Sequence, residues 1–254
     1  MQKYIQVRNV KIGEGVPKIC VPLVAKSKQE FLDMEKELEN IKLDLVELRI
    51  DHFEEVEDLD KVKELAKDLR QVLNETPILF TFRSLKEGGE KEVSVEYYKK
   101  LNIEIAKTGY VDLIDVELFT GDEIVKEIVL EAHKTNVKVV MSNHDFDKTP
   151  EKDEIVKRLC KMQELNADLP KIAVMPKSTT DVLTLLCATD DMVTKYAKTP
   201  IITMSMAGLG VISRLAGETF GSALTFGAAK VSSAPGQVEV NKLSEILEVL
   251  HNSR

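Results

Sequence analysis

Lys171 lies inside a short apolar run, residues 169–177, where a charged side chain is difficult to accommodate. Polar segments bound this run, and its composition is typical of a buried strand in a parallel sheet. Alternation along the strand places Lys171, Ala173 and Met175 on one face, so the amine requires a cavity, a carboxylate partner or the loss of its proton. A neutral amine in a cavity can attack a carbonyl carbon and form a Schiff base. For this lysine alone, a structural ion pair is the simpler interpretation.

His144 ends the strand-like run that precedes the run of Lys171. A lone histidine is more often structural than catalytic, but on a neighbouring parallel strand its imidazole could shuttle protons for the amine. Glu87 precedes two glycines, which permit a tight turn that would bring its carboxylate over the same end of the sheet. We expect Glu87 to orient the His144 ring and to favour its protonated form. Without these neighbours, Glu87 would be interpreted as an exposed loop residue.

Polar side chains recur on one face of several other strand-like runs. They are Glu47, Arg49 and Asp51 in the second run, Thr81 and Arg83 in the third, Asp115 and Glu117 in the fourth, and Ser142 with His144 in the fifth. The opposite faces are apolar and suit packing against helices, so the polar faces are expected to point inward, where charges need partners or a ligand. We expect the carboxylates to pair with Arg49 and Arg83. Only one histidine falls at this position, which argues against a metal centre with two or three histidines.

The segments that follow the last two strand-like runs carry groups that suit an anion. Residues 204–214 supply Arg214, and residues 231–237 supply the hydroxyl of Ser233 and the amide of Gln237. Loops at these positions of a barrel often bind an anion, and this set of groups suits a carboxylate with neighbouring hydroxyls. For the second segment in isolation, a plain surface turn is the alternative.

Eight strand-like runs alternate with eight amphipathic, charge-rich runs, and this pattern must position these residues. The strands are expected at residues 18–25, 43–51, 77–84, 111–119, 138–146, 170–176, 200–206 and 223–229, and the helices at 28–41, 56–73, 94–108, 122–135, 151–165, 179–196, 208–215 and 240–251. The pattern predicts one α/β domain over residues 1–254, a (β/α)8 TIM barrel whose active site lies at the carboxyl ends of the strands. A β-hairpin, residues 4–10 with a turn at Gly13-Glu14-Gly15, is expected to close the bottom of the barrel. A doubly wound open sheet is the alternative, but no glycine-rich phosphate fingerprint follows the first strand.

Composition excludes several other classes of protein. The net charge of -8 and the sequence pI of about 5.3 argue against a nucleic-acid partner. No apolar run approaches the roughly 18 residues that a membrane span requires, and the first residues lack the pattern of a signal peptide. The three cysteines, Cys20, Cys160 and Cys187, are interpreted as reduced, core-packed thiols of a cytoplasmic protein.

Six motifs occur in order along nearly the whole chain. They are Val46-Glu-Leu-Arg-Ile-Asp51, Thr81-Phe-Arg-Ser84 with Glu87-Gly-Gly89, Ser142-Asn-His-Asp-Phe146, Lys171, Ile202-Thr-Met-Ser-Met206 and Ser233-Ala-Pro-Gly-Gln237. Together they make the chain similar to the type I 3-dehydroquinate dehydratases, which are Schiff-base dehydratases of the shikimate pathway. The resemblance implies a (β/α)8 barrel, a homodimer, the small-molecule substrate 3-dehydroquinate and no metal or organic cofactor.

The resemblance also implies roles for individual residues. Lys171 would be the Schiff-base nucleophile, His144 the acid and base, and Glu87 the group that positions His144. The substrate would be bound by Glu47, Arg49, Arg83, Met204, Met206, Arg214, Phe226, Ser233 and Gln237. One position departs from the family pattern, because Pro22 stands where many relatives carry a serine that contacts the substrate.

Two other functions are compatible with part of this pattern. A sugar-phosphate aldolase would also use a lysine in a barrel, but it needs a phosphate cradle, and Arg214 with Ser233 and Gln237 suits a carboxylate better. A catalytically silent barrel could serve as a binding module. It would give no reason for Lys171, His144 and Glu87 to converge.

Overall fold

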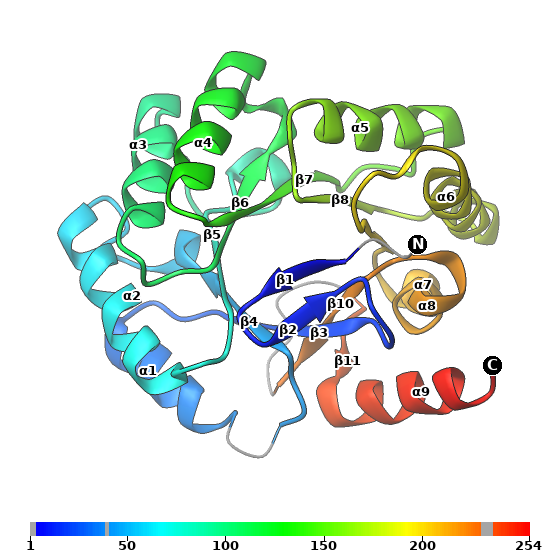
Figure 1. Cartoon of the computed structure of the whole chain (residues 1–254), viewed down its shortest axis with the longest axis horizontal. Coiled ribbons are helices and arrows are strands. Elements are labelled where there is room, and N and C mark those ends of the chain that lie inside the picture. The colour runs from blue at the N-terminus through cyan, green and yellow to red at the C-terminus, as the bar shows by residue number, and fades with distance from the viewer. Residues whose placement is uncertain (1–3, 39–40, 230–235) are drawn as a thin grey trace.

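Alternating strands and helices form a closed parallel barrel with an outer layer of helices (Figure 1). The computed structural model describes residues 4–38, 41–229 and 236–254. The barrel strands are β3 (Lys18–Leu23), β4 (Leu45–Arg49), β5 (Ile78–Thr81), β6 (Leu113–Glu117), β7 (Lys138–Asp145), β8 (Leu169–Val174), β9 (Ile202–Ser205) and β10 (Leu224–Ala228). Neighbours in this order pair in parallel from β3 to β9, and β10 pairs with β3. A bridge between Ile201 and Ser222 joins the starts of β9 and β10 and closes the ring, so the predicted barrel is confirmed and the open sheet is wrong.

Each predicted helical run contains a helix, although the first ends at Lys36, and a short helix at Gly217–Phe220 was not predicted. The helices are α1 (Lys28–Lys36), α2 (Leu59–Leu73), α3 (Val95–Ala106), α4 (Asp122–Lys134), α5 (Lys152–Glu164), α6 (Thr179–Asp191), α7 (Val211–Leu215), α8 (Gly217–Phe220) and α9 (Val240–Asn252). Serine side chains cap α1, α3 and α6 at Ser27, Ser94 and Ser178, which explains where these helices begin. Within the described part of the chain, no helix is long and apolar enough to cross a bilayer.

Several details differ from the sequence prediction. The helix predicted at 179–196 ends as a π-helical turn, Met192–Tyr196, and the one predicted at 208–215 begins as a 3-10 turn, Gly208–Gly210. A short strand, β11 (Val238–Glu239), also pairs with β10. Cys20 is buried as expected, but Cys160 is half-buried and Cys187 is exposed, because its side of α6 faces solvent together with Leu183.

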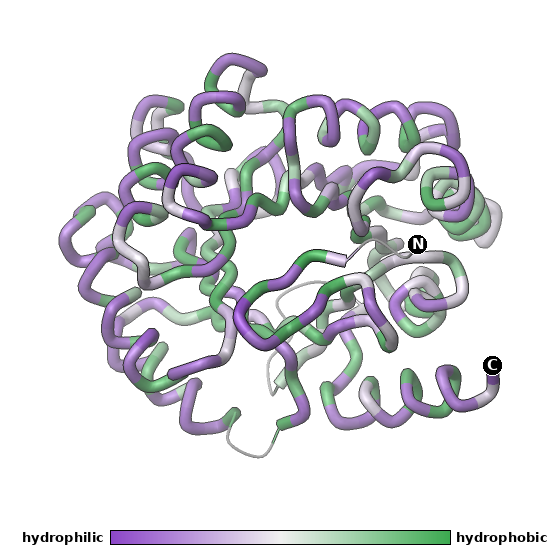
Figure 2. Tube along the Cα trace, viewed as in Figure 1, coloured by the Kyte–Doolittle hydropathy of each residue, from purple (hydrophilic) through white to green (hydrophobic). Residues whose placement is uncertain are grey.

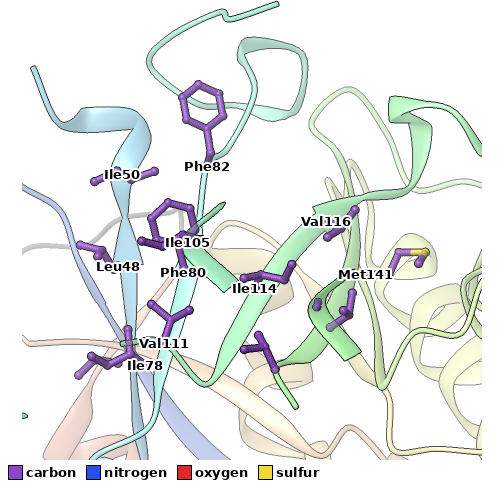
Figure 3. Close-up of a cluster of buried hydrophobic side chains, with 14 of the residues drawn as sticks. Leu48, Ile50, Ile78, Phe80, Phe82, Ile105, Val111, Ile114, Val116 and Met141 are labelled. Atoms are coloured by element: carbon purple, nitrogen blue, oxygen red, sulfur yellow. The ribbon is translucent and has the colours of Figure 1, made fainter. Parts of the chain in front are cut away.

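The alternation of side chains along each strand produces two separate hydrophobic cores. Outward-facing residues of the strands pack against the helices, and Figure 3 shows part of this outer core around Phe80, Ile114 and Met141. Inward-facing residues form a smaller core inside the barrel. Its strand members are Cys20, Leu45, Leu79, Leu113, Val140, Leu169, Ala173, Ile202, Met204, Leu224 and Phe226. Figure 2 shows that hydrophobic and hydrophilic residues alternate along the outer helices, as expected for helices with one face on the barrel.

The amino-terminal hairpin covers one end of the barrel. Its strands are β1 (Ile5–Val7) and β2 (Val10–Ile12), which pair antiparallel and lie across the barrel in Figure 1. Val7 and Ile12 join the inner core, which confirms that the hairpin closes the end where the strands begin. The predicted turn is wrong: the chain reverses at Arg8 and Asn9, with Arg8 at a positive φ of 51°. The glycines at 13–15 instead connect the hairpin to β3.

Candidate active site

A pocket at the carboxyl ends of the barrel strands collects the predicted site residues. It is lined by Glu47, Arg49, Arg83, Glu87, Gly88, His144, Phe146, Lys171, Ala173, Met204, Met206, Arg214, Phe226 and Gln237. Every residue that the sequence placed in the site therefore lines one pocket, except Ser233, which lies outside the described residues. The strands bring these residues together because inward-facing positions near their carboxyl ends converge on the barrel axis.

Lys171 extends from β8 into this pocket. Its side chain is only 4% exposed, and its Nζ lies 3.7 Å from Oδ2 of Asp115 and 4.4 Å from the ring centroid of Phe226. Strand register pairs Lys171 with Ser142 of β7, so both side chains face the barrel interior. The carboxylate and the aromatic face hold the amine in one place while the nitrogen still borders the pocket.

His144 is one inward-facing step further toward the mouth than Ser142, and it lies opposite Ala173 of β8. Its Nδ1 is 3.0 Å from Oε2 of Glu87, and its backbone N–H donates to the same oxygen at 2.9 Å. Burial, together with the nearby cations Arg83, Lys171 and Arg49, lowers the pKa of His144 well below its usual value. Burial and these cations favour the neutral ring, and the expectation that Glu87 favours the protonated ring stays a prediction.

The turn after β5 places Glu87, as the two glycines predicted. A 3-10 turn, Leu85–Glu87, leads into Gly88 at a φ of 84°, a conformation that side chains rarely adopt. At Gly89, a Cβ atom would lie 1.9 Å from the carbonyl oxygen of Arg83, so no other residue fits without movement. Burial and the neighbouring Glu117 raise the pKa of Glu87 to about 7.

Arg83 is the centre of a buried network beneath the pocket. Its Nη1 donates to Oε1 of Glu117 and to Oγ of Ser142, both at 2.9 Å, and its Nη2 lies 2.9 Å from Oδ2 of Asp115. The Ser142 hydroxyl in turn donates to Oδ1 of Asp115 at 2.6 Å. The predicted pairing of carboxylates with arginine is confirmed here, and the network joins the environment of Lys171 to that of Glu87, which is 3.6 Å from Arg83.

Arg49 forms a separate bidentate pair. Its Nε and Nη2 donate to the two carboxylate oxygens of Asp51, each at 2.9 Å. This geometry holds the guanidinium plane, and the pKa of Asp51 is lowered by Arg49 even though burial acts in the opposite direction. Nearby, the Thr81 hydroxyl donates to Oε1 of Glu47 at 2.9 Å. This contact holds the Glu47 carboxylate, which also lines the pocket.

The part of the pocket formed by β9, β10 and α7 combines sulfur, aromatic and cationic side chains. Arg214 on α7 donates from Nη1 to Sδ of Met204 at 3.5 Å, and burial lowers its pKa to about 10. Met206 and Phe226 are buried beside it and supply apolar surface. Pro22 lies in β3 directly opposite Glu47 in the strand register.

Sequence reasoning left out several residues that the structure places in or next to the site. Asp115, Glu117 and Ser142 were recognised only as polar faces of strands, although all three surround Arg83. Asn143 was missed because its position in β7 has outward parity, yet its amide donates to Oε1 of Glu87 at 3.2 Å. Its place beside His144 was the only available signal. The described residues contain no group of three or more histidine, cysteine, aspartate or glutamate side chains placed to hold a metal ion.

Comparison with known proteins agrees with this geometry. The family model for type I 3-dehydroquinase matches residues 19–254. A 3-dehydroquinate dehydratase of Clostridioides difficile (strain 630) is 59% identical over 253 residues, which cover 100% of this chain and 99% of the relative. Another from Listeria monocytogenes serotype 4a (strain HCC23) is 61% identical over 247 residues, covering 97% and 98%. A crystal structure of the type I enzyme from Clostridium difficile with covalently modified comenic acid has a TM-score of 0.98, at 59% identity and 100% coverage of both chains. The chain therefore belongs to the type I 3-dehydroquinase family.

Proposed function

We propose that the protein removes water from 3-dehydroquinate to give 3-dehydroshikimate, through a Schiff base on Lys171. Membership of the family supports the reaction, and the observation that carries the mechanism is the pocket shared by Lys171, His144 and Glu87. An amine and an imidazole that border one cavity are the two groups that imine formation and proton transfer require.

The reaction begins when Nζ of Lys171, as the free amine, attacks the ring ketone of the substrate. His144 transfers protons while the carbinolamine forms and loses water, which leaves a protonated imine. This imine withdraws electrons and acidifies the neighbouring C–H bond, so that His144 can remove the proton and form an enamine. The enamine electrons then expel the hydroxyl group, which leaves as water with the proton held by His144. Hydrolysis of the conjugated imine releases the product and restores Lys171.

The depressed pKa of His144 suits the first proton removal. A buried neutral ring has one nitrogen available as a base, and Glu87 contacts the other nitrogen, Nδ1. We infer that Nε2 is the atom that exchanges protons with the substrate. Asp115, which accepts from Ser142 and pairs with Arg83, fixes the surroundings of Lys171 from the opposite side.

The remaining lining residues are proposed to bind the substrate. Arg214, Ser233 and Gln237 suit its carboxylate and hydroxyls, and Glu47, Arg49 and Arg83 suit the other polar positions of the ring. Met204, Met206 and Phe226 would pack against its carbon skeleton. We further propose, from the family resemblance, that the protein acts as a cytoplasmic homodimer without a metal or organic cofactor.

Borohydride reduction in the presence of 3-dehydroquinate tests the Schiff base directly. We expect mass spectrometry to find a reduced adduct on the peptide that contains Lys171, and none in Lys171→Met. His144→Ala should lose at least about 10²-fold in turnover, the lower range for acid–base catalysis, and still form the adduct. Full dehydratase turnover by Lys171→Met would exclude the mechanism. Turnover of ketose phosphates in place of 3-dehydroquinate would instead favour an aldolase.

A further inference from the structure

A line of hydrogen bonds leads from the outer helix layer to the catalytic histidine. Nη1 of Arg158, on α5, donates to Oδ1 of Asn143 at 2.9 Å. Nδ2 of Asn143 donates to Oε1 of Glu87 at 3.2 Å, and Oε2 of Glu87 contacts Nδ1 of His144 at 3.0 Å. Asn143 is only 4% exposed. Its buried amide joins helix α5 to the turn that carries Glu87, two parts of the fold that the proposed mechanism does not otherwise connect.

Arg158 determines which end of the Asn143 amide faces Glu87. A guanidinium group only donates hydrogen bonds, so the amide oxygen must face Arg158 and the NH2 group must face the carboxylate. Arg158 is itself held in place, since its Nε donates to Glu154 at 2.9 Å and its guanidinium lies 5.4 Å from the ring centroid of Phe119. The orientation of the amide is therefore a property of the packed structure.

Both oxygens of Glu87 consequently face hydrogen-bond donors. Oε1 receives the Asn143 NH2 group, and Oε2 receives the backbone N–H of His144. A proton on Oε1 would face the Asn143 NH2 group, so this contact favours the ionised carboxylate, whose Oε2 can accept from Nδ1 of His144. An ionised carboxylate can only accept, which keeps the ring proton on Nδ1 of His144 and leaves Nε2 free to act as a base.

We propose that Asn143, oriented by Arg158, is a positioning residue that selects the catalytic tautomer of His144 by keeping Glu87 as an acceptor. The inference rests on the proposed role of His144 as acid and base. It adds to that mechanism two residues outside the pocket lining, Asn143 and Arg158, that determine which ring nitrogen of His144 carries the proton.

Several neighbouring groups shift the ionisation of the Glu87 carboxyl group in opposite directions. Arg83, which follows β5, and Asn143 and the backbone N–H of His144, on β7, favour the ionised form. Burial and Glu117, at the end of β6, favour the protonated form and raise the pKa of Glu87 to about 7. His144 itself shares the contact, and Lys171 faces the ring from β8. Loss of the Asn143 donor should therefore raise the pKa further and protonate Glu87 at neutral pH.

The test compares two leucine substitutions at buried asparagines. Asn143→Leu removes the donor, and Asn102→Leu is the matched control, because Asn102 on α3 donates to the carbonyl oxygen of Tyr98 and does not line the pocket. We expect the acid limb of the kcat/KM profile to move up by about one pH unit in Asn143→Leu, which is about a tenfold loss at pH 6. The profile of Asn102→Leu should keep its shape. Arg158→Met, which frees the amide to rotate, should shift the acid limb in the same direction by a smaller amount.

Nitrogen-15 NMR of the histidine side chains gives a measurement that does not depend on activity. The signals of His144 can be assigned by their loss in His144→Gln. We expect the ring proton on Nδ1 in the wild-type protein at pH 8, and a larger Nε2–H population in Asn143→Leu. If Asn143→Leu does not fold, Arg158→Met supplies the same comparison. Superimposable pH profiles and an unchanged tautomer in the folded variants would overturn the inference. A wild-type protein without dehydratase activity would refute the proposed function, and the tautomer measurement would still decide the role of Asn143.

Discussion

Burial moves the pKa values of two neighbouring groups in opposite directions at the mouth of the barrel. It raises the pKa of Glu87 to about 7, and it lowers the pKa of His144 well below its usual value. Burial is the largest cause of both shifts, since removal from water disfavours whichever form is charged. At neutral pH the imidazole is consequently available to accept a proton, which is the state that the first half of the proposed reaction needs.

The raised pKa of Glu87 also has a consequence for stability. Its folded-state pKa is about 7 against a reference of 4.5, so its contribution to stability is fully present below about pH 4.5 and is lost as the pH rises through 7. Glu87→Gln removes this titration. We expect the free energy of unfolding of the variant, relative to wild type, to rise between pH 4.5 and pH 7 and then to level off.

Urea denaturation at pH 5 and pH 8 measures this difference, and dehydratase assays should show reduced turnover in Glu87→Gln. Asp190→Asn, which changes an exposed carboxylate on α6, is the control. A difference in unfolding free energy between Glu87→Gln and wild type that stays constant across this pH range would contradict the argument.

At the scale of the element, the turn after β5 determines whether Glu87 reaches His144. Gly89 has no room for a side chain, because a Cβ atom would overlap the carbonyl group of Arg83. Gly89→Ala should therefore displace the turn and separate the carboxylate from the ring. We expect kcat to fall by at least about tenfold, a part of the 10²–10⁴-fold range for acid–base catalysis, with a smaller change in KM.

Gly208→Ala is the matched control for this turn. Gly208 also follows a barrel strand, but its added Cβ would meet nothing within 4 Å and its backbone has no positive φ. Steady-state kinetics should therefore leave Gly208→Ala close to wild type. Equal losses in the two alanine variants would show that the turn at Gly89 has no special role.

The elements also show why some of the site was predictable from sequence. Lys171, His144 and Arg83 could be assigned to the interior because strand alternation and barrel closure together determine which side chains converge. The contact of Asn143 could not be predicted, since it depends on how far the turn after β5 reaches across β6 to β7. The hairpin turn was misplaced because glycines are the usual signal, whereas the chain reverses at Arg8 and Asn9.

At the scale of the whole molecule, stability and chemistry are concentrated at opposite ends of the barrel interior. The carboxyl ends of the strands carry the charged pocket, and the other end holds an apolar core closed by the hairpin. The outer core between strands and helices is separate from both and contains most of the buried apolar side chains. Changes at the hairpin should therefore affect folding without altering the proposed reaction.

Ile12 allows this separation to be measured. It lies in β2, is fully buried, and packs into the inner core with Leu45 and Leu79 among others. Ile12→Ala should lower the free energy of unfolding by about 2–5 kcal/mol, through lost burial and the cavity that remains. Lys11→Ala, on the exposed side of the same strand, should leave the free energy of unfolding nearly unchanged. Chemical denaturation gives both values. Because the pocket lies at the other end of the barrel, kcat/KM of folded Ile12→Ala should match wild type, and a large loss of activity without loss of stability would mean that the hairpin contributes to the site.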